Sequence, residues 1–296
     1  TLSLAAHFRR DEHNESQTSA PGKTGATAEP NQESLEKTWS VALENRYALS
    51  DALSFTLGAS YDWRHLDKAE EYSASHIPPL YSFPLKDAEG WNGQGRIDWN
   101  GADGSSLYAS LSSRIRFPTL FERFSSQFGT AEPNPDLKPE RATNLEFGGT
   151  KRFGAVRLSG AVYYSWLNDA LVTIRTSANL NKRENIGSAE YYGAEIGFDA
   201  TIAPGLEAGI NYSYIHRSFD VGTAPVGGFI RLFKLTDVPA HKGFAYISWK
   251  PVKQLTILPS VEFSSDRMTV DAATADGNAP AYFKLDGYVN ASLRID

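Results

Sequence analysis

The stretch VRLSGAVYYSWL, Val156 to Leu167, changes the character of its side chains at every step. The even positions up to Trp166 are mostly apolar, whereas the odd positions from Arg157 to Ser165 are small or polar. A period of two places successive side chains on opposite faces of a β-strand. The stretch therefore predicts a strand with one apolar face and one polar face.

The same alternation recurs along nearly the whole chain, in about twelve segments that are mostly about ten to fourteen residues long. Examples are LSFTLGASYDWR from Leu53, LEAGINYSYIHR from Leu206, and the final segment from Phe283. Strands usually have about five or six residues. Helical periodicity is nearly absent. The chain is therefore expected to be all-β and antiparallel, with unusually long strands.

The connections between these segments alternate in length. Short turns are expected near residues 49–52, 101–105, 152–155, 203–205 and 251–254. Long polar connections are expected near residues 11–34, 68–88, 118–139, 168–187, 219–238 and 268–281. This rhythm places the short turns on one rim of a meandering sheet and the long connections on the other, with both chain ends on the short-turn rim.

Three architectures compete for this pattern. A soluble β-sandwich also alternates, but its strands are shorter and its loops show no strict alternation in length. A propeller or solenoid would show a repeated sequence unit, which is not visible here. An up-and-down transmembrane β-barrel combines strands of about ten residues, one lipid-facing apolar face, short periplasmic turns and long outer loops. The pattern favours the transmembrane barrel.

Aromatic residues support the barrel, because amphipathic rings suit the headgroup region of a membrane. Many of them stand toward the ends of the apolar faces: Trp39, Tyr47, Trp63, Trp91, Trp99, Phe117, Trp166 and Tyr214.

Charge and cysteine content argue against other classes of protein. The net charge of −6 leaves no basic footprint for nucleic acid, and the lack of cysteine excludes disulfides and thiolate chemistry.

Between Arg114 and Gly148 the run RIRFPTLFERF, followed by NPDLKPERATNLEFG, interrupts the alternation. This run resembles the C-terminal barrel of TonB-dependent outer-membrane receptors, which carry an Arg-x-Pro-Thr-Leu-x-Glu-Arg-like loop and an Asn-Pro-x-Leu-Lys-Pro-Glu segment. NIGSAEYYGAEIGF from Asn185 and DVPAHKGFAYISWKP from Asp237 resemble two further strand entries of that family. The resemblance covers most of the chain from about Asp87 onward.

The resemblance implies a bacterial outer-membrane barrel of about 22 strands, plugged by an N-terminal domain. No plug is visible in the sequence, and the chain ends NASLRID instead of on the aromatic residue that the family carries. Residues 1–296 are therefore expected to form one partial transmembrane β-barrel domain, with the plug and the flanking strands absent. Thr1–Arg10 and Phe283–Asp296 should then not pair with each other.

The resemblance also implies a function. It implies a receptor in the bacterial outer membrane that takes up a metal chelate, with energy from a TonB-type transducer that acts through the plug. A ferric siderophore is the expected chelate, and cobalamin or another metal chelate is second. Two alternatives stay open: a passive channel formed by a complete barrel of about twelve strands, and a soluble β-rich binding module. The expected partners are outer-membrane lipid, the chelate and the transducer, without nucleic acid.

No catalytic constellation is found in the sequence. None of the six histidines pairs with another at metal-ligand spacing, and neither a nucleophile elbow nor a phosphate-binding glycine loop is present. We therefore expect no enzyme, no metal site and no cofactor.

Two sets of residues are candidates for binding. An aromatic and cationic surface on the outer loops would suit an anionic, partly aromatic chelate, although packing between loops explains the same residues: Arg116, Phe121, Arg123, Tyr81, Phe83, Phe229 and Arg231. Charged residues on the polar faces of strands would contact a plug or line the path of the ligand, or else form cross-strand pairs in a wide lumen: Arg114, Glu146, Glu195 and Asp199.

Overall fold

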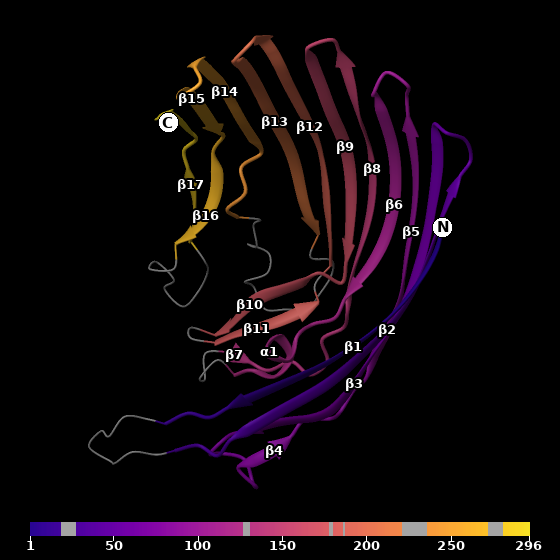
Figure 1. Ribbon diagram of the computed structural model, residues 1–296. Coiled ribbons are helices and arrows are strands. Elements are labelled where there is room, and N and C mark those ends of the chain that lie inside the picture. The colour runs from indigo at the N-terminus through magenta and orange to yellow at the C-terminus, as the bar shows by residue number, and fades with distance from the viewer. Residues whose placement is uncertain (19–27, 127–130, 178–179, 186, 221–235, 272–280) are drawn as a thin grey trace.

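The computed structural model describes residues 1–18, 28–126, 131–177, 180–185, 187–220, 236–271 and 281–296. Most of them form one curved antiparallel sheet whose long strands pair in chain order, with the short strands of the connections left out of the path (Figure 1). The strands on this path, in order, are β1 (Leu2–Glu15), β2 (Gln32–Ala48), β3 (Leu53–Tyr72), β5 (Ala88–Asn100), β6 (Ser106–Arg116), β8 (Glu140–Phe153), β9 (Val156–Asn168), β12 (Ser188–Ala203), β13 (Leu206–Asp220), β14 (His241–Val252), β15 (Leu255–Ser264) and β18 (Tyr288–Ile295).

The long connections are more ordered than the sequence predicts. Instead of plain loops, their described residues form six short strands and one helix: β4 (Leu80–Ser82), α1 (Leu120–Phe124), β7 (Ala131–Glu132), β10 (Leu171–Ser177), β11 (Leu180–Asn185), β16 (Arg267–Asp271) and β17 (Ala281–Leu285). Such short segments carry too few residues to show a period. Within the described ranges, no helix is long and apolar enough to cross a membrane.

The two rims follow the predicted rhythm. The hairpins β8–β9 and β12–β13 turn within a few residues on one rim, whereas the described elements of the long connections, such as β4, α1 and β10, lie toward the other (Figure 1). The tight turns use glycines with positive φ, 60° at Gly154 and 75° at Gly205, a conformation that a Cβ disfavours. Both chain ends lie on the short-turn rim: the Thr1 ammonium donates to the Arg46 carbonyl at 2.6 Å, and the Asp296 amide donates to the Thr256 carbonyl at 2.9 Å.

The convex face of the sheet is apolar and open. Leu43, Leu57, Leu111 and Ile196, from four different strands, are 50%, 49%, 53% and 52% exposed. Aromatic rings follow one another across neighbouring strands of this face, toward the long-connection rim, with centroids 4.4 to 6.0 Å apart. They are Phe8, Trp39, Trp63, Tyr61 and Trp91 on β1 to β5, and Trp166, Tyr164, Tyr192 and His216 on β9 to β13. This is the pattern of a lipid-facing wall with an interfacial belt.

The sheet does not close on itself. β1 and β18 stand at its opposite edges, β1 paired with β2 and β18 paired with β15 (Figure 1). Among the described residues, Thr1–Arg10 therefore do not pair with the last strand, as the sequence reasoning expected. The fold prediction is confirmed as an antiparallel, partial barrel wall of the predicted number of strands.

Tyrosine rings cover glycines on the concave face. In three cross-strand pairs, a Cβ added to the glycine would lie within 2.7 Å of an atom of the facing ring. The pairs are Tyr108 with Gly148, Tyr163 with Gly193, and Tyr246 with Gly209. The flat ring takes the place of the missing side chain and shields the backbone from the lumen, which fixes the register of neighbouring strands.

We predict that Gly148→Ala destabilises the wall. Its new methyl group would meet the Tyr108 hydroxyl at 2.7 Å and the Gly160 carbonyl at 2.9 Å, so the ring must move. Overpacking of this kind costs roughly 1–3 kcal/mol. The measurement is the melting temperature of the detergent-solubilised full-length protein, followed by far-UV circular dichroism.

The matched control is Gly160→Ala on the adjacent strand, where the nearest atom is the Glu195 carbonyl oxygen at 3.4 Å. We expect the control to melt within a degree or two of the parent, because the methyl group enters open space. Equal melting temperatures for the two variants would contradict the role assigned to the ring.

Candidate functional site

The segment between β6 and β8 folds inward and lies on the concave side of the wall as α1 (Figure 1). Thr119 begins the helix with a reciprocal cap: its hydroxyl accepts from the Glu122 amide at 3.2 Å, and the Glu122 carboxylate accepts from the Thr119 amide at 2.8 Å. Leu120 and Phe124 are 6% and 4% exposed and join the small apolar core with Leu66 of β3. The cap orients one turn of helix, and the two apolar side chains attach it to the wall.

Arg116 connects three elements at the start of this segment. Its guanidinium donates to Glu140 at 2.5 Å and to Glu122 at 3.0 Å, and thus joins the end of β6 to α1 and to the start of β8. Burial alone would raise the pKa of the Glu122 carboxyl, but the Thr119 amide and the Arg116 guanidinium hold it below its ordinary value. The cap therefore stays ionised at neutral pH, while the Arg116 side chain remains 47% exposed.

A buried arginine of the wall contacts the start of the segment that contains α1. Arg64 of β3 lies 3.3 Å from the Glu36 carboxylate of β2, and both side chains are almost enclosed, 10% and 3% exposed. Arg64 also donates to the Pro118 carbonyl and stacks 4.6 Å from the centre of the Phe117 ring. Removing one partner of an ion pair that is buried away from water leaves an unpaired charge and strongly destabilises the fold. Arg64 therefore secures the entry of the segment.

Arg123 secures its exit. The residue is 3% exposed, and its guanidinium donates to the Pro135 carbonyl at 3.2 Å and to the Lys86 carbonyl at 3.4 Å. It also lies 4.7 Å from the centre of the Phe124 ring. Its contacts are therefore with the backbone of two connections and with α1.

Two of the predicted aromatic residues belong to a row of rings that ends on α1. The Phe83 ring stacks on Phe124 with centroids 5.5 Å apart, and Tyr81 of β4 contacts Phe83 edge-on at 5.6 Å. His76 stacks in turn on Tyr81 at 4.2 Å. The rings therefore form a continuous packed row between the β3–β5 connection and α1.

Phe121 points away from this core and is 45% exposed. The guanidinium of Arg183, on β11, lies 5.2 Å from the centre of its ring and donates to its carbonyl at 3.4 Å. β11 belongs to a small sheet in the order β10–β11–β7 that lies beside α1 (Figure 1). Phe121 and Arg116 are nearly half exposed and Arg183 is half-buried beside Phe121. We call these three residues the rim surface.

The structure thus brings Arg116, Phe121, Arg123, Tyr81 and Phe83 into one cluster. Arg123 is enclosed and the rings of Tyr81 and Phe83 are packed, which favours the loop-packing explanation for these three. Phe229 and Arg231 lie outside the described residues. Sequence reasoning missed Arg183, because nothing in a polar connection indicates which cation will stack on a ring from another connection.

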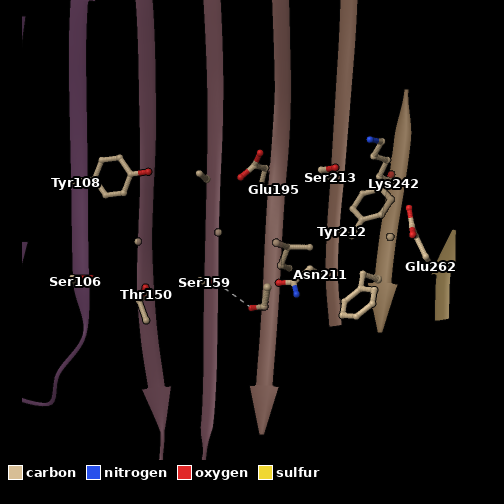
Figure 2. Close-up of a pocket in the computed structure, with 17 residues that line it drawn as sticks. Ser106, Tyr108, Thr150, Ser159, Glu195, Asn211, Tyr212, Ser213, Lys242 and Glu262 are labelled. Carbon is tan, nitrogen blue, oxygen red and sulfur yellow. Dashed lines mark hydrogen bonds between the residues drawn. The ribbon is translucent and has the colours of Figure 1, made fainter. Parts of the chain in front are cut away.

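A second candidate surface is a hollow in the concave wall between β6 and β15, with a volume of 550 Å³ (Figure 2). Hydroxyl, amide and charged side chains from neighbouring strands point into it: Ser106, Tyr108, Thr150, Ser159, Glu195, Asn211, Ser213, Lys242 and Glu262. Lys242 makes no ion pair with a carboxylate of the described residues. The hollow therefore offers one cation and two carboxylates, Glu195 and Glu262, to a polar partner.

The four predicted lumen residues all belong to the concave face. Glu195 lines the hollow, and Glu146 accepts from the Tyr108 hydroxyl. Arg114 donates to Gln94 at 2.6 Å, and Asp199 accepts from Tyr246 at 3.4 Å. The prediction omitted Tyr108, Asn211, Ser213, Lys242 and Glu262. Their polar phase in the alternation could have found them, but the register that brings them together could not be read from one strand at a time.

No cluster of three or more metal-ligating side chains occurs among the residues that the structure describes. Arg116 on the rim surface is paired with carboxylates, and Glu262 of the hollow accepts from the Tyr288 hydroxyl at 2.7 Å. These surfaces are suited to hold a polar or charged molecule by several weak contacts.

Comparison with known proteins decides the family. Over residues 1–296, the sequence matches the family described as "TonB dependent receptor-like, beta-barrel". The chain belongs to the TonB-dependent receptor family. The resemblance inferred from the sequence is thereby confirmed, and the place of this receptor barrel is the bacterial outer membrane.

Several known proteins are similar to this receptor barrel. An "Iron-regulated outer membrane virulence protein" of Vibrio cholerae is 24% identical over 275 residues, which are 86% of this chain and 38% of the relative. The structure of "Copper transporter OprC" superposes with a TM-score of 0.80 at 16% identity, over 99% of this chain and 46% of OprC. The siderophore receptor PiuA from Acinetobacter baumannii superposes with a TM-score of 0.70 at 15% identity, over 99% of this chain and 46% of PiuA.

These comparisons establish the fold and the family. The chain spans less than half the length of these relatives, and the identities to the solved structures are low. Family and neighbours are receptors and transporters. What this receptor barrel transports is a separate question.

We predict that Arg64→Met releases the α1 segment of the receptor barrel. Removing the guanidinium leaves Glu36 buried without its partner, and breaking a buried pair costs roughly 3–5 kcal/mol. Backbone amides of residues 119–125 should then exchange with deuterium at least about tenfold faster in the full-length protein, as measured by mass spectrometry. Arg114→Met is the control, because Arg114 bonds Gln94 away from α1. Unchanged exchange in Arg64→Met would show that the apolar contacts hold α1 alone.

Proposed function

We propose that this chain is part of the wall of an outer-membrane receptor that takes up a ferric siderophore, driven by a TonB-type transducer. The observation that supports iron as the metal is the similarity to the iron-regulated protein of Vibrio cholerae over most of this chain. The siderophore receptor among the structural neighbours agrees with this choice, although it supports the fold alone.

The rim surface supports an anionic ligand with aromatic character. Arg183 provides a positive charge beside the exposed Phe121 ring, and Arg116, although paired with Glu122 and Glu140, keeps 47% of its side chain exposed. Catecholate and similar ferric chelates carry negative charge and flat rings, so they would gain both charge-assisted hydrogen bonds and ring contacts here. The packed residues Arg123, Tyr81 and Phe83 would act as the support that fixes this surface.

The hollow of the concave wall offers a surface against which a plug domain would lie. We propose that a plug domain lies against the hollow, where Lys242, Glu195 and Glu262 would meet polar groups of opposite character. A wall of about 22 strands is the size that encloses such a plug. The twelve-strand path described here would then be one part of that wall, and the transducer would act on the plug.

The two alternatives have less support. A passive channel of these strands alone would need β1 to pair with β18, and they occupy opposite edges of the sheet. A soluble binding module would leave the convex face of Leu43, Leu57, Leu111 and Ile196 in water, and soluble proteins rarely expose such large apolar surfaces.

Uptake assays test the proposal directly. Cells that lack the gene for the full-length protein should lose uptake of one radiolabelled ferric siderophore from a panel, and cells that lack the transducer should lose it too. Uptake of radiolabelled cobalamin and of copper in the strain that lacks only the gene for the full-length protein is the control, and it should be unchanged. Loss of cobalamin or copper uptake with normal iron uptake would overturn the iron assignment while leaving the receptor family intact.

We predict that Phe121→Ala weakens binding of the siderophore identified in that assay. Loss of one ring contact is worth roughly 0.5–1.5 kcal/mol, so the dissociation constant should rise about twofold to tenfold. The measurement is equilibrium binding to the purified full-length receptor. Phe153→Ala is the matched control, an exposed ring, 60% accessible, on the opposite rim. Equal effects of the two variants would remove the rim surface from the ligand site.

A further inference from the structure

Two glycines face each other on the convex side of the wall, where the surrounding positions carry large side chains. Gly149 of β8 pairs with Gly160 of β9. On the two adjacent strands, Leu107 of β6 lies opposite Gly149 and Ile196 of β12 lies opposite Gly160. The next cross-strand pairs on the same face also carry large side chains: Phe147 with Val162 on one side of the glycines, and Lys151 with Leu158 on the other. Two missing side chains in a filled surface leave a groove, and its volume is 750 Å³.

The groove is open at its floor and apolar at its sides. A Cβ added to Gly160 would have one neighbour within 4 Å, the Glu195 carbonyl oxygen at 3.4 Å. Leu107 leans over Gly149 instead, with its Cδ2 only 2.6 Å from where a Cβ would stand. Phe147, Val162 and Ile196 are 53%, 53% and 52% exposed. The space above Gly160 is thus free to receive an apolar chain.

One end of the groove carries a pair of opposite charges. Lys151 lies two residues beyond Gly149 toward the short-turn rim, about 6–7 Å along the strand. Its ammonium lies 2.6 Å from the carboxylate of Asp103, which belongs to the β5–β6 turn, and the two side chains are 46% and 53% exposed. In barrels of this kind the short turns face the periplasm. The charges therefore stand at headgroup level, beside an apolar groove.

A buried hydroxyl lines the same end. Ser105 is 4% exposed and borders the groove. Its Oγ has no hydrogen-bond partner within the described part of the chain, whereas its backbone amide donates to the Asp103 carboxylate at 3.0 Å. A hydroxyl so placed can turn to an oxygen of a molecule that enters the groove.

We propose that the groove binds one phospholipid whose headgroup carries both a phosphate and a primary ammonium. Lys151 receives the phosphate, the Asp103 carboxylate accepts hydrogen bonds from the ammonium, and an acyl chain fills the space above Gly160. The lipid exchanges the single Lys151–Asp103 contact for two contacts of the same kind, so neither charge is left unpaired. The site faces the membrane, away from the rim surface, and lies on the opposite face of the same strands from the hollow of the concave wall, with which it shares Gly149 and Gly160.

The paired charges decide between kinds of occupant. An anionic headgroup would satisfy Lys151 and repel Asp103, whereas a quaternary ammonium has no N–H group to donate to the carboxylate. A second copy of this chain would have to bring a narrow apolar ridge and a complementary charge pair to the same place. A zwitterionic lipid with a primary ammonium meets both requirements in one molecule.

Native mass spectrometry of the full-length protein in detergent tests this assignment. The probes are phosphatidylethanolamine, phosphatidylcholine and phosphatidylglycerol with identical acyl chains, each added to delipidated protein. We expect one tightly held phosphatidylethanolamine, bound roughly tenfold more tightly than the other two lipids, because one charge-assisted hydrogen bond is worth about that factor. Asp103→Asn should remove this preference, and Lys151→Met should weaken all three lipids.

Gly160→Leu should abolish the tightly held lipid, because the new side chain fills the groove. The matched control is Gly93→Leu, another lipid-facing glycine with open space, whose added Cβ would have its nearest neighbour at 4.0 Å; it should retain the lipid. Equal retention of the three headgroups, or retention of the tight lipid in Gly160→Leu, would overturn the proposal. A change in oligomeric mass in Gly160→Leu, without loss of lipid, would instead assign the groove to an interface between copies of the chain.

Discussion

The structure depends on one constraint: backbone amides and carbonyls that face hydrocarbon must be paired within the protein. From β2 to β15, each strand on the sheet path is paired on both sides, with the strand before it and the strand after it on the path. Pairing over the thickness of a membrane requires strands longer than those of soluble sheets, and the alternation then gives every strand an apolar and a polar face. The two faces of the wall, and therefore both candidate surfaces, follow from this requirement.

The polar face solves a different problem from the apolar one. The side chains of a wide barrel wall cannot fill its lumen, so on the concave face tyrosine rings cover glycines and charged groups form hydrogen bonds with side chains of neighbouring strands. The hollow between β6 and β15 lies where Tyr108, Ser159 and Asn211 leave room between them. On the convex side the Gly149–Gly160 pair leaves room as well. Because glycines have no side chain, the same region of the wall is less covered on both faces, toward the lumen and toward the lipid.

The outer rim is organised by buried charge instead of by a large apolar core. Arg64 and Arg123 hold the α1 segment through carbonyls, a carboxylate and ring faces, while Leu120 and Phe124 add a small apolar contact. Guanidinium groups suit this task because their planar donors reach several acceptors at once and also stack on rings. The result is a fixed platform on which Phe121, Arg116 and Arg183 are presented outward. For the ligand proposed above, a preorganised surface of this kind would reduce the entropy lost on binding.

The sequence by itself determined the strands, their two faces, the two rims and the family, because each depends on local periodicity or on a contiguous motif. The run from Arg114 to Gly148 identified the family, and the alternation fixed Glu146 and Glu195 on the lumen side. Only the tertiary structure decided that Arg123 is enclosed, that Arg183 stacks on Phe121, and that short strands form within the long connections. It also decided that Gly149 meets Gly160 and that Lys242 shares a hollow with Glu195. These contacts join residues far apart in the chain, and they depend on strand register and on how connections fold over the rim. A period of two cannot encode either property, because it specifies the face of a side chain but not its neighbour on the next strand.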